Sequence, residues 1–185
     1  RLSTVRTLAA AAALLLLTAA PAGADDTRGL ETLVDAAVQR LSVADPVAAS
    51  KWLSGGPITD PPRVRQVLAD VASAAESAGV PTEYVTEVFT DQIAATGAVQ
   101  YRRFAGWKLD PAAAPTSAPD LTDSRALIDQ MNRVMVTEIA QDWPVLSGPG
   151  CASALASAKE AVAQRRSLDP LYRQALDTAT RSYCG

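Results

Sequence analysis

Residues 30–53 read LETLVDAAVQRLSVADPVAASKWL and carry a helical pattern. In the first half, apolar residues recur every three or four positions, which is the spacing of one face of an α-helix; they are Leu30, Leu33, Val34, Ala37 and Leu41. A turn at Ser54-Gly55-Gly56-Pro57 follows. We therefore predict a helix over about 27–53. Asp45-Pro46 leaves two interpretations open, because it could bend one long helix or begin a second one with Asp45 as its cap.

Five further helical segments follow along the chain, separated by glycines and prolines. We predict them at about 60–79, at 82–105, from a cap at Asp120 or Thr122 to Trp143-Pro144, at 151–166 and at 169–183. Residues 111–119 form a linker rich in Pro and Ala. No convincing alternation of apolar and polar residues, the mark of a strand, occurs. The predicted fold is all-α, a single-domain bundle of six helices with a long first helix and a C-terminal helical pair.

Polar residues interrupt these apolar helices at spacings that bring their side chains together. Arg40 and Lys51 are eleven residues apart, which is three turns and about 20°, so both cations project from one helix face. Thr96 and Gln100, four residues apart, share a face in the same way. Their small apolar neighbours suggest that these groups face inward, where they need partners. Two cations and a neutral amide directed to one place predict a pocket for a small dianion.

The first turn of the second predicted helix adds two more polar residues. Asp60 followed by Pro61 has the form of a helix cap and a first-turn residue. Two interpretations of Asp60 stay open, since it could be a cap only or could also contact a bound molecule. Arg63 lies in the same turn and adds a third cation.

At these residues the chain resembles the all-helical AroQ class of chorismate mutases, specifically the secreted gamma subclass, over about residues 27–184. The resemblance includes the stretches 42–49, 84–89 and 101–109 and the two late cysteines. It also includes the order and spacing of seven polar residues, which are Arg40, Lys51, Asp60, Arg63, Thr96, Gln100 and Arg125. It favours one long, bent first helix.

This resemblance implies the conversion of chorismate to prephenate, an intramolecular Claisen rearrangement that needs no cofactor, metal or covalent intermediate. It implies that Lys51 and Gln100 hold the ether oxygen of the substrate, and that the catalytic residues are these two and Arg40. Arg40 and Arg125 would bind the two carboxylates, and Arg63 would complete the cationic lining.

Two further site residues have roles that come from the same resemblance. Thr96 would contact a carboxylate, and Asp60 would order the helix start near the substrate hydroxyl. Val67 stands where secreted relatives have a polar residue, so we expect somewhat weaker substrate binding. The resemblance also implies a homodimer whose pockets each form within one chain, because Arg125 supplies a cation that other AroQ enzymes take from a partner subunit.

Residues 1–24 predict a secretory signal peptide. Arg1 and Arg6 precede an apolar run over 8–20, and small residues at Ala22 and Ala24 fit cleavage after Ala24. We expect a secreted or periplasmic protein with one chorismate mutase domain over 25–185; the alternative is an uncleaved membrane anchor. Without the first 24 residues the chain has 15 basic and 20 acidic residues, a net charge of −5. That charge argues against nucleic acid or an anionic membrane as a partner.

The cysteine and histidine content limits the chemistry further. Cys151 and Cys184 are the two cysteines, and in an exported protein such a pair predicts a disulfide, the alternative being two free buried thiols. The chain has no histidine, which excludes a Ser-His-Asp or Cys-His nucleophilic site and a zinc site that uses histidine. A competing hypothesis is a secreted helical protein without catalysis that binds a small dicarboxylate or a protein partner.

Overall fold

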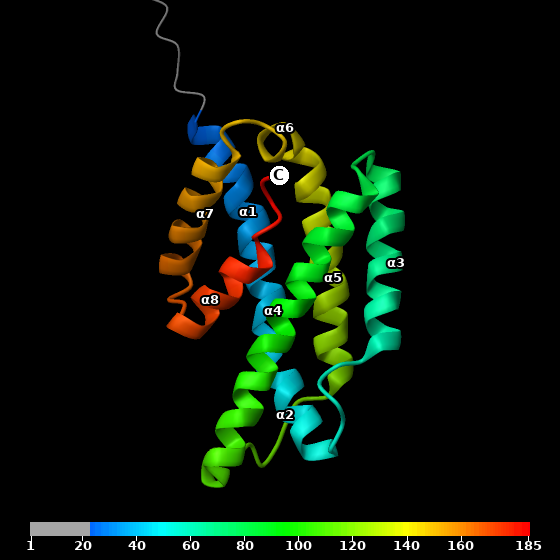
Figure 1. Cartoon of the computed structure of the whole chain (residues 1–185), viewed down its shortest axis with the longest axis vertical. Helices are drawn as coiled ribbons and strands as arrows, with labels where there is room; N and C mark the ends of the chain where they lie inside the picture. The colour runs from blue at the N-terminus through cyan, green and yellow to red at the C-terminus, as the bar shows by residue number, and fades with distance from the viewer. Residues whose placement is uncertain (1–22) are drawn as a thin grey trace, which may run out of the picture.

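The computed structural model describes residues 23–185, with side chains from Leu30 onward, and its regular elements are helical (Figure 1). The elements are α1 Gly23–Ser42, α2 Ala44–Ser54, α3 Pro61–Ala78, α4 Thr82–Leu109, the 3₁₀-helix η1 Pro111–Ala113, α5 Leu121–Gln141, α6 Trp143–Leu146, α7 Cys151–Arg165 and α8 Pro170–Ala179. No strand occurs within this range, which confirms the all-α prediction. The signal peptide predicted over 1–24 lies, apart from its last two residues, outside the described part of the chain.

The long first helix is divided into α1 and α2 at Val43. Pro46 has no N–H to donate to the carbonyl of Ser42, so the helical ladder is interrupted there. Val47 donates to the carbonyl of Val43 at 3.0 Å, and Val43 keeps a right-handed backbone with φ −72° and ψ −10°. The structure therefore lies between the two interpretations, with two helices that meet at a single residue. The other departures are the short α6 and η1, a third predicted helix, α4, that extends to Leu109, and a last helix, α8, that ends at Ala179 and does not reach Tyr183.

Three helices begin where aspartates cap them. Asp60 accepts a bond from the backbone N–H of Arg63 at 3.2 Å, and Asp169 accepts one from Tyr172 at 2.8 Å. Asp120 accepts from Thr122 at 2.8 Å, which settles the cap of α5 that the sequence left open. Each of these side chains satisfies a backbone donor that the helix itself leaves unpaired.

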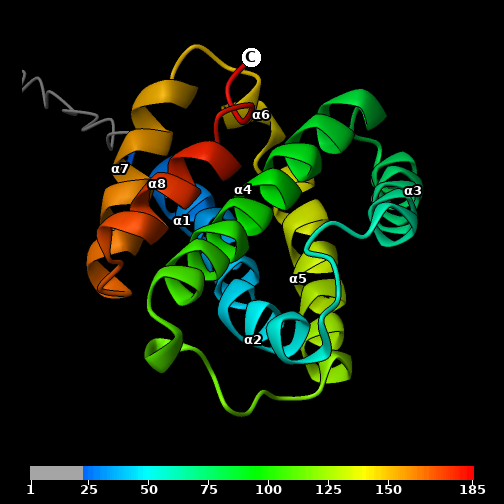
Figure 2. The ribbon, with the colours of Figure 1, turned by 60° about the horizontal axis from the view of Figure 1, so that its bottom comes forward.

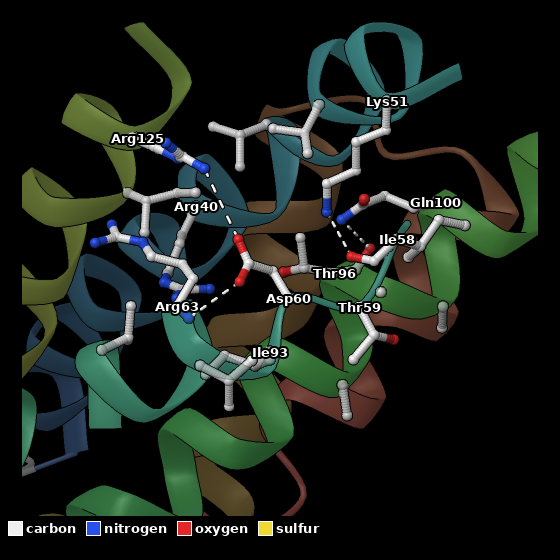
Figure 3. A pocket seen from close by; sticks show the side chains of 18 of the residues that line it. Arg40, Lys51, Ile58, Thr59, Asp60, Arg63, Ile93, Thr96, Gln100 and Arg125 are labelled. Atoms are coloured by element: carbon white, nitrogen blue, oxygen red, sulfur yellow. Dashed lines mark hydrogen bonds and ion pairs between the residues drawn. The ribbon is translucent and has the colours of Figure 1, made fainter. Parts of the chain in front are cut away.

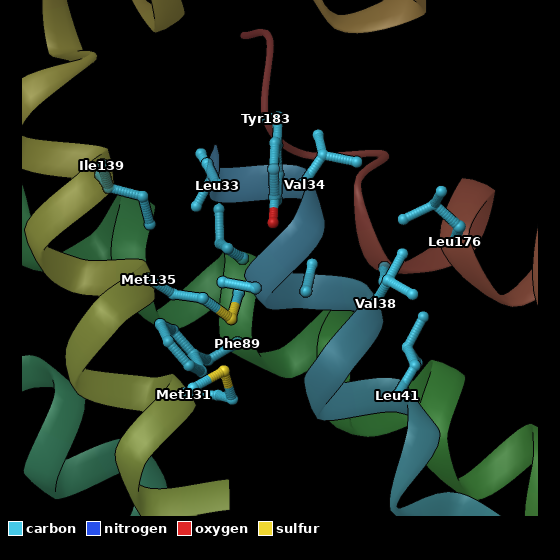
Figure 4. Close-up of a cluster of buried hydrophobic side chains, with 14 of the residues drawn as sticks. Leu33, Val34, Val38, Leu41, Phe89, Met131, Met135, Ile139, Leu176 and Tyr183 are labelled. Carbon is cyan, nitrogen blue, oxygen red and sulfur yellow. The ribbon is translucent and has the colours of Figure 1, made fainter. Parts of the chain in front are cut away.

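The core forms where α1 passes between α5 on one side and α7 and α8 on the other, with α4 across it (Figures 1 and 2). Leu33 and Leu41 of α1 are fully buried, as the helical pattern predicts, and they belong to one cluster with Phe89 of α4 and Met135 of α5 (Figure 4). Burying large apolar side chains of this kind contributes about 1.5–3 kcal/mol each. The core fixes α1, α4 and α5 relative to one another, and these helices carry most of the candidate site.

The C-terminal pair α7 and α8 is closed by the predicted disulfide between Cys151 and Cys184, with Cα atoms 5.6 Å apart. Tyr183, next to Cys184, is fully buried, and its ring enters the core cluster (Figure 4). Tyr84 of α4 donates its hydroxyl to the Tyr183 carbonyl at 2.7 Å. A bond between residues 33 positions apart stabilises a fold by about 3–4 kcal/mol in the chain-entropy model.

Candidate active site

A cavity of about 580 Å³ lies among α1, α2, α3, α4 and α5. All seven polar residues singled out in the sequence line it, namely Arg40, Lys51, Asp60, Arg63, Thr96, Gln100 and Arg125. Figure 3 shows the arginines on one side of this cavity and Lys51 with Gln100 on the other. The break at Val43 does not separate Arg40 from Lys51, because both side chains line this cavity and Val43 itself keeps a helical backbone.

Arg40 is the most deeply buried cation of the cavity, with 3 % of its surface exposed. Its Nε donates to Oδ1 of Asn132 on α5 at 2.7 Å, and its guanidinium carbon lies 5.8 Å from the centre of the Phe89 ring. Among the described residues it forms no ion pair. Burial, together with the nearby charge of Arg63, lowers the pKa of Arg40 to about 10. A buried, charged arginine without a carboxylate is a strong site for an incoming anion.

The other two arginines already have acidic partners. Arg63 Nη2 lies 2.6 Å from Oδ1 of Asp129 on α5, and Arg125 Nη2 lies 3.8 Å from Oδ2 of Asp60. Asp60 therefore both caps α3 and faces a cation of the cavity. The cap is confirmed, and contact of Asp60 with a bound molecule stays a prediction. The half-exposed Arg125 side chain is held loosely at this distance, which leaves it able to turn toward a ligand.

Lys51 and Gln100 bring two donor nitrogens to the same side of the cavity (Figure 3). The Lys51 ammonium donates to the backbone carbonyl of Ile58 at 2.5 Å, and Gln100 Nε2 donates to the carbonyl of Thr96 at 3.4 Å. Burial lowers the pKa of Lys51; the carboxylate of Asp60 opposes this shift and the charge of Arg125 adds to it. Gln100 is 5 % exposed, and the long bond to Thr96 uses only one of its two amide hydrogens.

The rest of the lining is mainly apolar and shapes the cavity. Val43 and Val47 come from the α1–α2 junction, and Ile93 comes from α4. Val67 is buried at the cavity wall, whereas its neighbour Gln66 is exposed and bonds to Asp70 at 2.8 Å. The hydroxyl of Thr96 donates to the Gln92 carbonyl at 2.8 Å, so its oxygen is left to accept a bond from the cavity.

Sequence reasoning missed three groups that hold the site residues. These are Asn132, which accepts a hydrogen bond from Arg40, Asp129, which accepts one from Arg63, and the carbonyl of Ile58, which accepts one from Lys51. Asp129 and Asn132 are three residues apart and so share one face of α5, which was a readable signal. Which helix that face meets depends on tertiary packing, and the backbone carbonyl of a loop residue leaves no mark in the sequence.

The arrangement combines an anion-binding wall with a pair of donors and has no nucleophile set against a base. Within the described residues, no group of three or more potential metal-ligating side chains gathers, and no helix is long and apolar enough to cross a membrane. Such a site can bind a compact dianion and stabilise negative charge that develops opposite the arginines.

Comparison with known proteins gives matches to chorismate mutases. Residues 31–101 match the family described as chorismate mutase type II. The secreted chorismate mutase of Mycolicibacterium smegmatis is 57% identical over 163 residues, which cover 88% of this chain and 90% of that protein. The secreted chorismate mutase of Mycobacterium tuberculosis is 50% identical over 176 residues, covering 92% and 88%.

A solved structure agrees with the sequence matches. The crystal structure of the chorismate mutase from Burkholderia phymatum has a TM-score of 0.81 to this chain, with 33% identity, and the match covers 86% of this chain and 98% of that one. Its fold therefore corresponds to almost the whole described part of the molecule. On the sequence matches and the shared fold, the chain belongs to the chorismate mutase family.

Proposed function

We propose that this protein is an exported chorismate mutase that converts chorismate to prephenate in the cavity between α1 and α5. The observation that carries the proposal is the convergence of three arginines opposite the Lys51–Gln100 donor pair. The reaction is an isomerisation within one molecule. The ether C–O bond breaks as a new C–C bond forms, so no atom or electron is gained or lost and the site needs no nucleophile.

The arginine wall would select the reactive conformer of the substrate. Chorismate carries two carboxylates on a flexible skeleton, and rearrangement requires its two reacting ends to lie together. Arg40 would bind one carboxylate through the two terminal nitrogens that its bond to Asn132 leaves unused. Arg125 would bind the other carboxylate, with Arg63 adding positive charge nearby. The apolar walls of the cavity exclude extended conformers.

The donor pair would lower the barrier itself. Negative charge grows on the ether oxygen as the C–O bond lengthens, and Lys51 and Gln100 point their nitrogens at one place. Such preorganised donors act mainly on the transition state, since the ground-state ether is a weak acceptor. Thr96, whose proton is already donated to Gln92, is better placed to accept from the substrate hydroxyl than to meet a carboxylate.

Loss of chorismate absorbance on addition of the purified protein tests this function. Prephenate should appear in equal amount, identified by its NMR spectrum, because the two compounds have the same mass. A non-catalytic dicarboxylate-binding protein would bind chorismate in calorimetry and leave its absorbance unchanged. That result would replace the enzymatic function with the binding one.

The pH dependence of catalysis should show an alkaline limb and none near neutrality. The chain has no histidine, and the cations required are Arg40, with a pKa lowered to about 10, and Lys51, with a pKa below its usual 10.5. A lowered pKa means that the charge is lost at a lower pH, so kcat/KM should be flat from about pH 6 to 8 and fall above that range.

Bound chorismate should shift this alkaline limb to higher pH. The dianion favours the protonated form of both cations, so kcat, which reports the complex, should fall at a higher pH than kcat/KM, which reports the free enzyme. Steady-state rates in buffers from pH 6 to 11 measure both curves. A kcat limb at or below the kcat/KM limb would contradict the assignment of these cations to the substrate.

Export and assembly belong to the same proposal. Residues 1–24 would direct secretion and be removed, which N-terminal sequencing of the exported protein tests. Two chains would associate into a homodimer with each pocket complete within one chain, supported by all seven site residues lining a cavity of a single chain. Sedimentation as an active monomer at micromolar concentration would refute the dimer.

A further inference from the structure

Arg40 is unusual among the cations of the cavity because its one hydrogen-bonding partner in the described part of the chain is neutral. Asn132 accepts from its Nε at 2.7 Å, and both side chains lie away from solvent, with 3 % and 7 % of their surfaces exposed. The aromatic face of Phe89 at 5.8 Å is neutral as well. Arg40 thus carries its charge into the protein interior with no carboxylate bonded to it among the described residues; the nearest acidic charge that acts on it is Asp129, which is already paired with Arg63.

Arg63 of α3 provides an internal comparison, because its partner lies on the same helix as Asn132. Asp129, one turn before Asn132 on α5, forms an ion pair with Arg63 at 2.6 Å. Helix α5 therefore supports two arginines of one cavity in two different ways, with a carboxylate for Arg63, which is partly exposed, and an amide for Arg40, which is buried. The acceptor geometry of Asn and Asp side chains is almost the same, so the difference between the two positions is charge.

We propose that Asn132 is a positioning residue that orients the guanidinium of Arg40 while leaving its charge for a substrate carboxylate to neutralise. The inference rests on the proposed function and assigns the reason for an amide at this position. The bond to Nε fixes the plane of the guanidinium and directs its two terminal nitrogens into the cavity, where they form a fork that fits a carboxylate. A carboxylate at residue 132 would satisfy the same nitrogen but neutralise the cation before the substrate arrives.

Asn132→Asp tests the charge directly, because it keeps the shape and the acceptor. The new carboxylate beside Arg40 should stay ionised and compete with the substrate. We expect KM for chorismate to rise at least tenfold, with a smaller change in kcat. The melting temperature of the ligand-free protein in a buffer poor in anions should stay the same or rise, since a buried cation gains a partner.

Asn132→Ala and Gln130→Glu complete the series. Alanine removes the bond to Arg40 but adds no charge, so its KM should rise less than that of Asn132→Asp. If the amide served only to hold the fold together, the order would reverse, because aspartate preserves the bond and alanine does not. Gln130 is exposed on α5, and Gln130→Glu adds the same charge to the same helix away from the cavity; its KM should equal the wild-type value.

The outcomes separate this inference from the proposed function. Turnover by the wild-type protein tests the function, and the comparison among variants tests the role of Asn132. A wild-type KM in Asn132→Asp, a KM rise in Asn132→Ala at least as large as in Asn132→Asp, or a loss of stability in Asn132→Asp would each overturn the inference. A larger KM in Asn132→Asp with stability maintained would support it.

Discussion

Replacing Lys51 with alanine should lower kcat about 10²–10³-fold, the usual loss for one preorganised donor to a developing negative charge. The Lys51 ammonium is held by the Ile58 carbonyl at 2.5 Å, on the same side of the cavity as Gln100. Its proposed partner, the ether oxygen, carries substantial negative charge only in the transition state. The loss should therefore fall mainly on kcat, with a much smaller change in KM.

Lys108→Ala is the matched control for this variant. Lys108 is exposed near the end of α4 and does not line the cavity, so its removal should leave both kinetic constants unchanged. Initial rates over a range of chorismate concentrations at pH 7 measure the effect, and circular dichroism checks that both variants stay helical. Retention of more than about a third of wild-type kcat by Lys51→Ala would show that Lys51 does not contact the reacting oxygen.

Gln100→Glu should lower activity at pH 7 by about 10²-fold or more and recover part of it as the pH falls. The substitution is nearly isosteric, yet it replaces an amide donor with a carboxylate that faces the developing negative charge unless it is protonated. The wild-type residue is 5 % exposed, and burial would raise the pKa of a new carboxyl group there, while Lys51 and the arginines would lower it. Activity should return as the pH falls through that value.

The pH profile of kcat distinguishes a lost donor from a damaged fold. A distorted cavity would lower the rate at every pH, whereas a carboxylate that becomes a donor when protonated gives a rate that rises toward acid. Gln130→Glu makes the same chemical change on the exposed face of α5 and should keep the flat wild-type profile. Wild-type activity with a flat profile in Gln100→Glu would remove Gln100 from the mechanism.

The sequence predicted local features better than contacts between helices. Asp60 stands before Pro61, which predicts a helix cap, and that cap forms. Capping depends on a few consecutive residues, so the information is local. The sequence did not decide between one bent helix and two helices around Pro46, because a missing N–H can either bend or end a helix.

For the candidate site too, the sequence predicted which residues line the cavity but not the groups that hold them. Helical spacing placed Arg40 and Lys51 on one face, and they do line one cavity. The partners that hold the cations were not predictable, because Asn132 lies 92 positions from Arg40 and Asp129 lies 66 from Arg63. Contacts at that separation depend on how α5 packs against α1 and α3, and the apolar pattern of each helix gives its buried face without naming the neighbour.

The burial of Tyr183 next to the disulfide-bonded Cys184 affects how easily proteases can cleave the C-terminal segment of this protein. When the last turn of the chain leaves the core, the bond from Cys184 to Cys151 keeps Tyr183 close to its site, at an effective concentration in the millimolar range typical of short tethers. The return of Tyr183 to the core is then an intramolecular step. The form in which the last turn is detached is therefore short-lived and rarely populated. For the exported enzyme proposed here, cleavage of the C-terminal pair would have to compete with that rapid return.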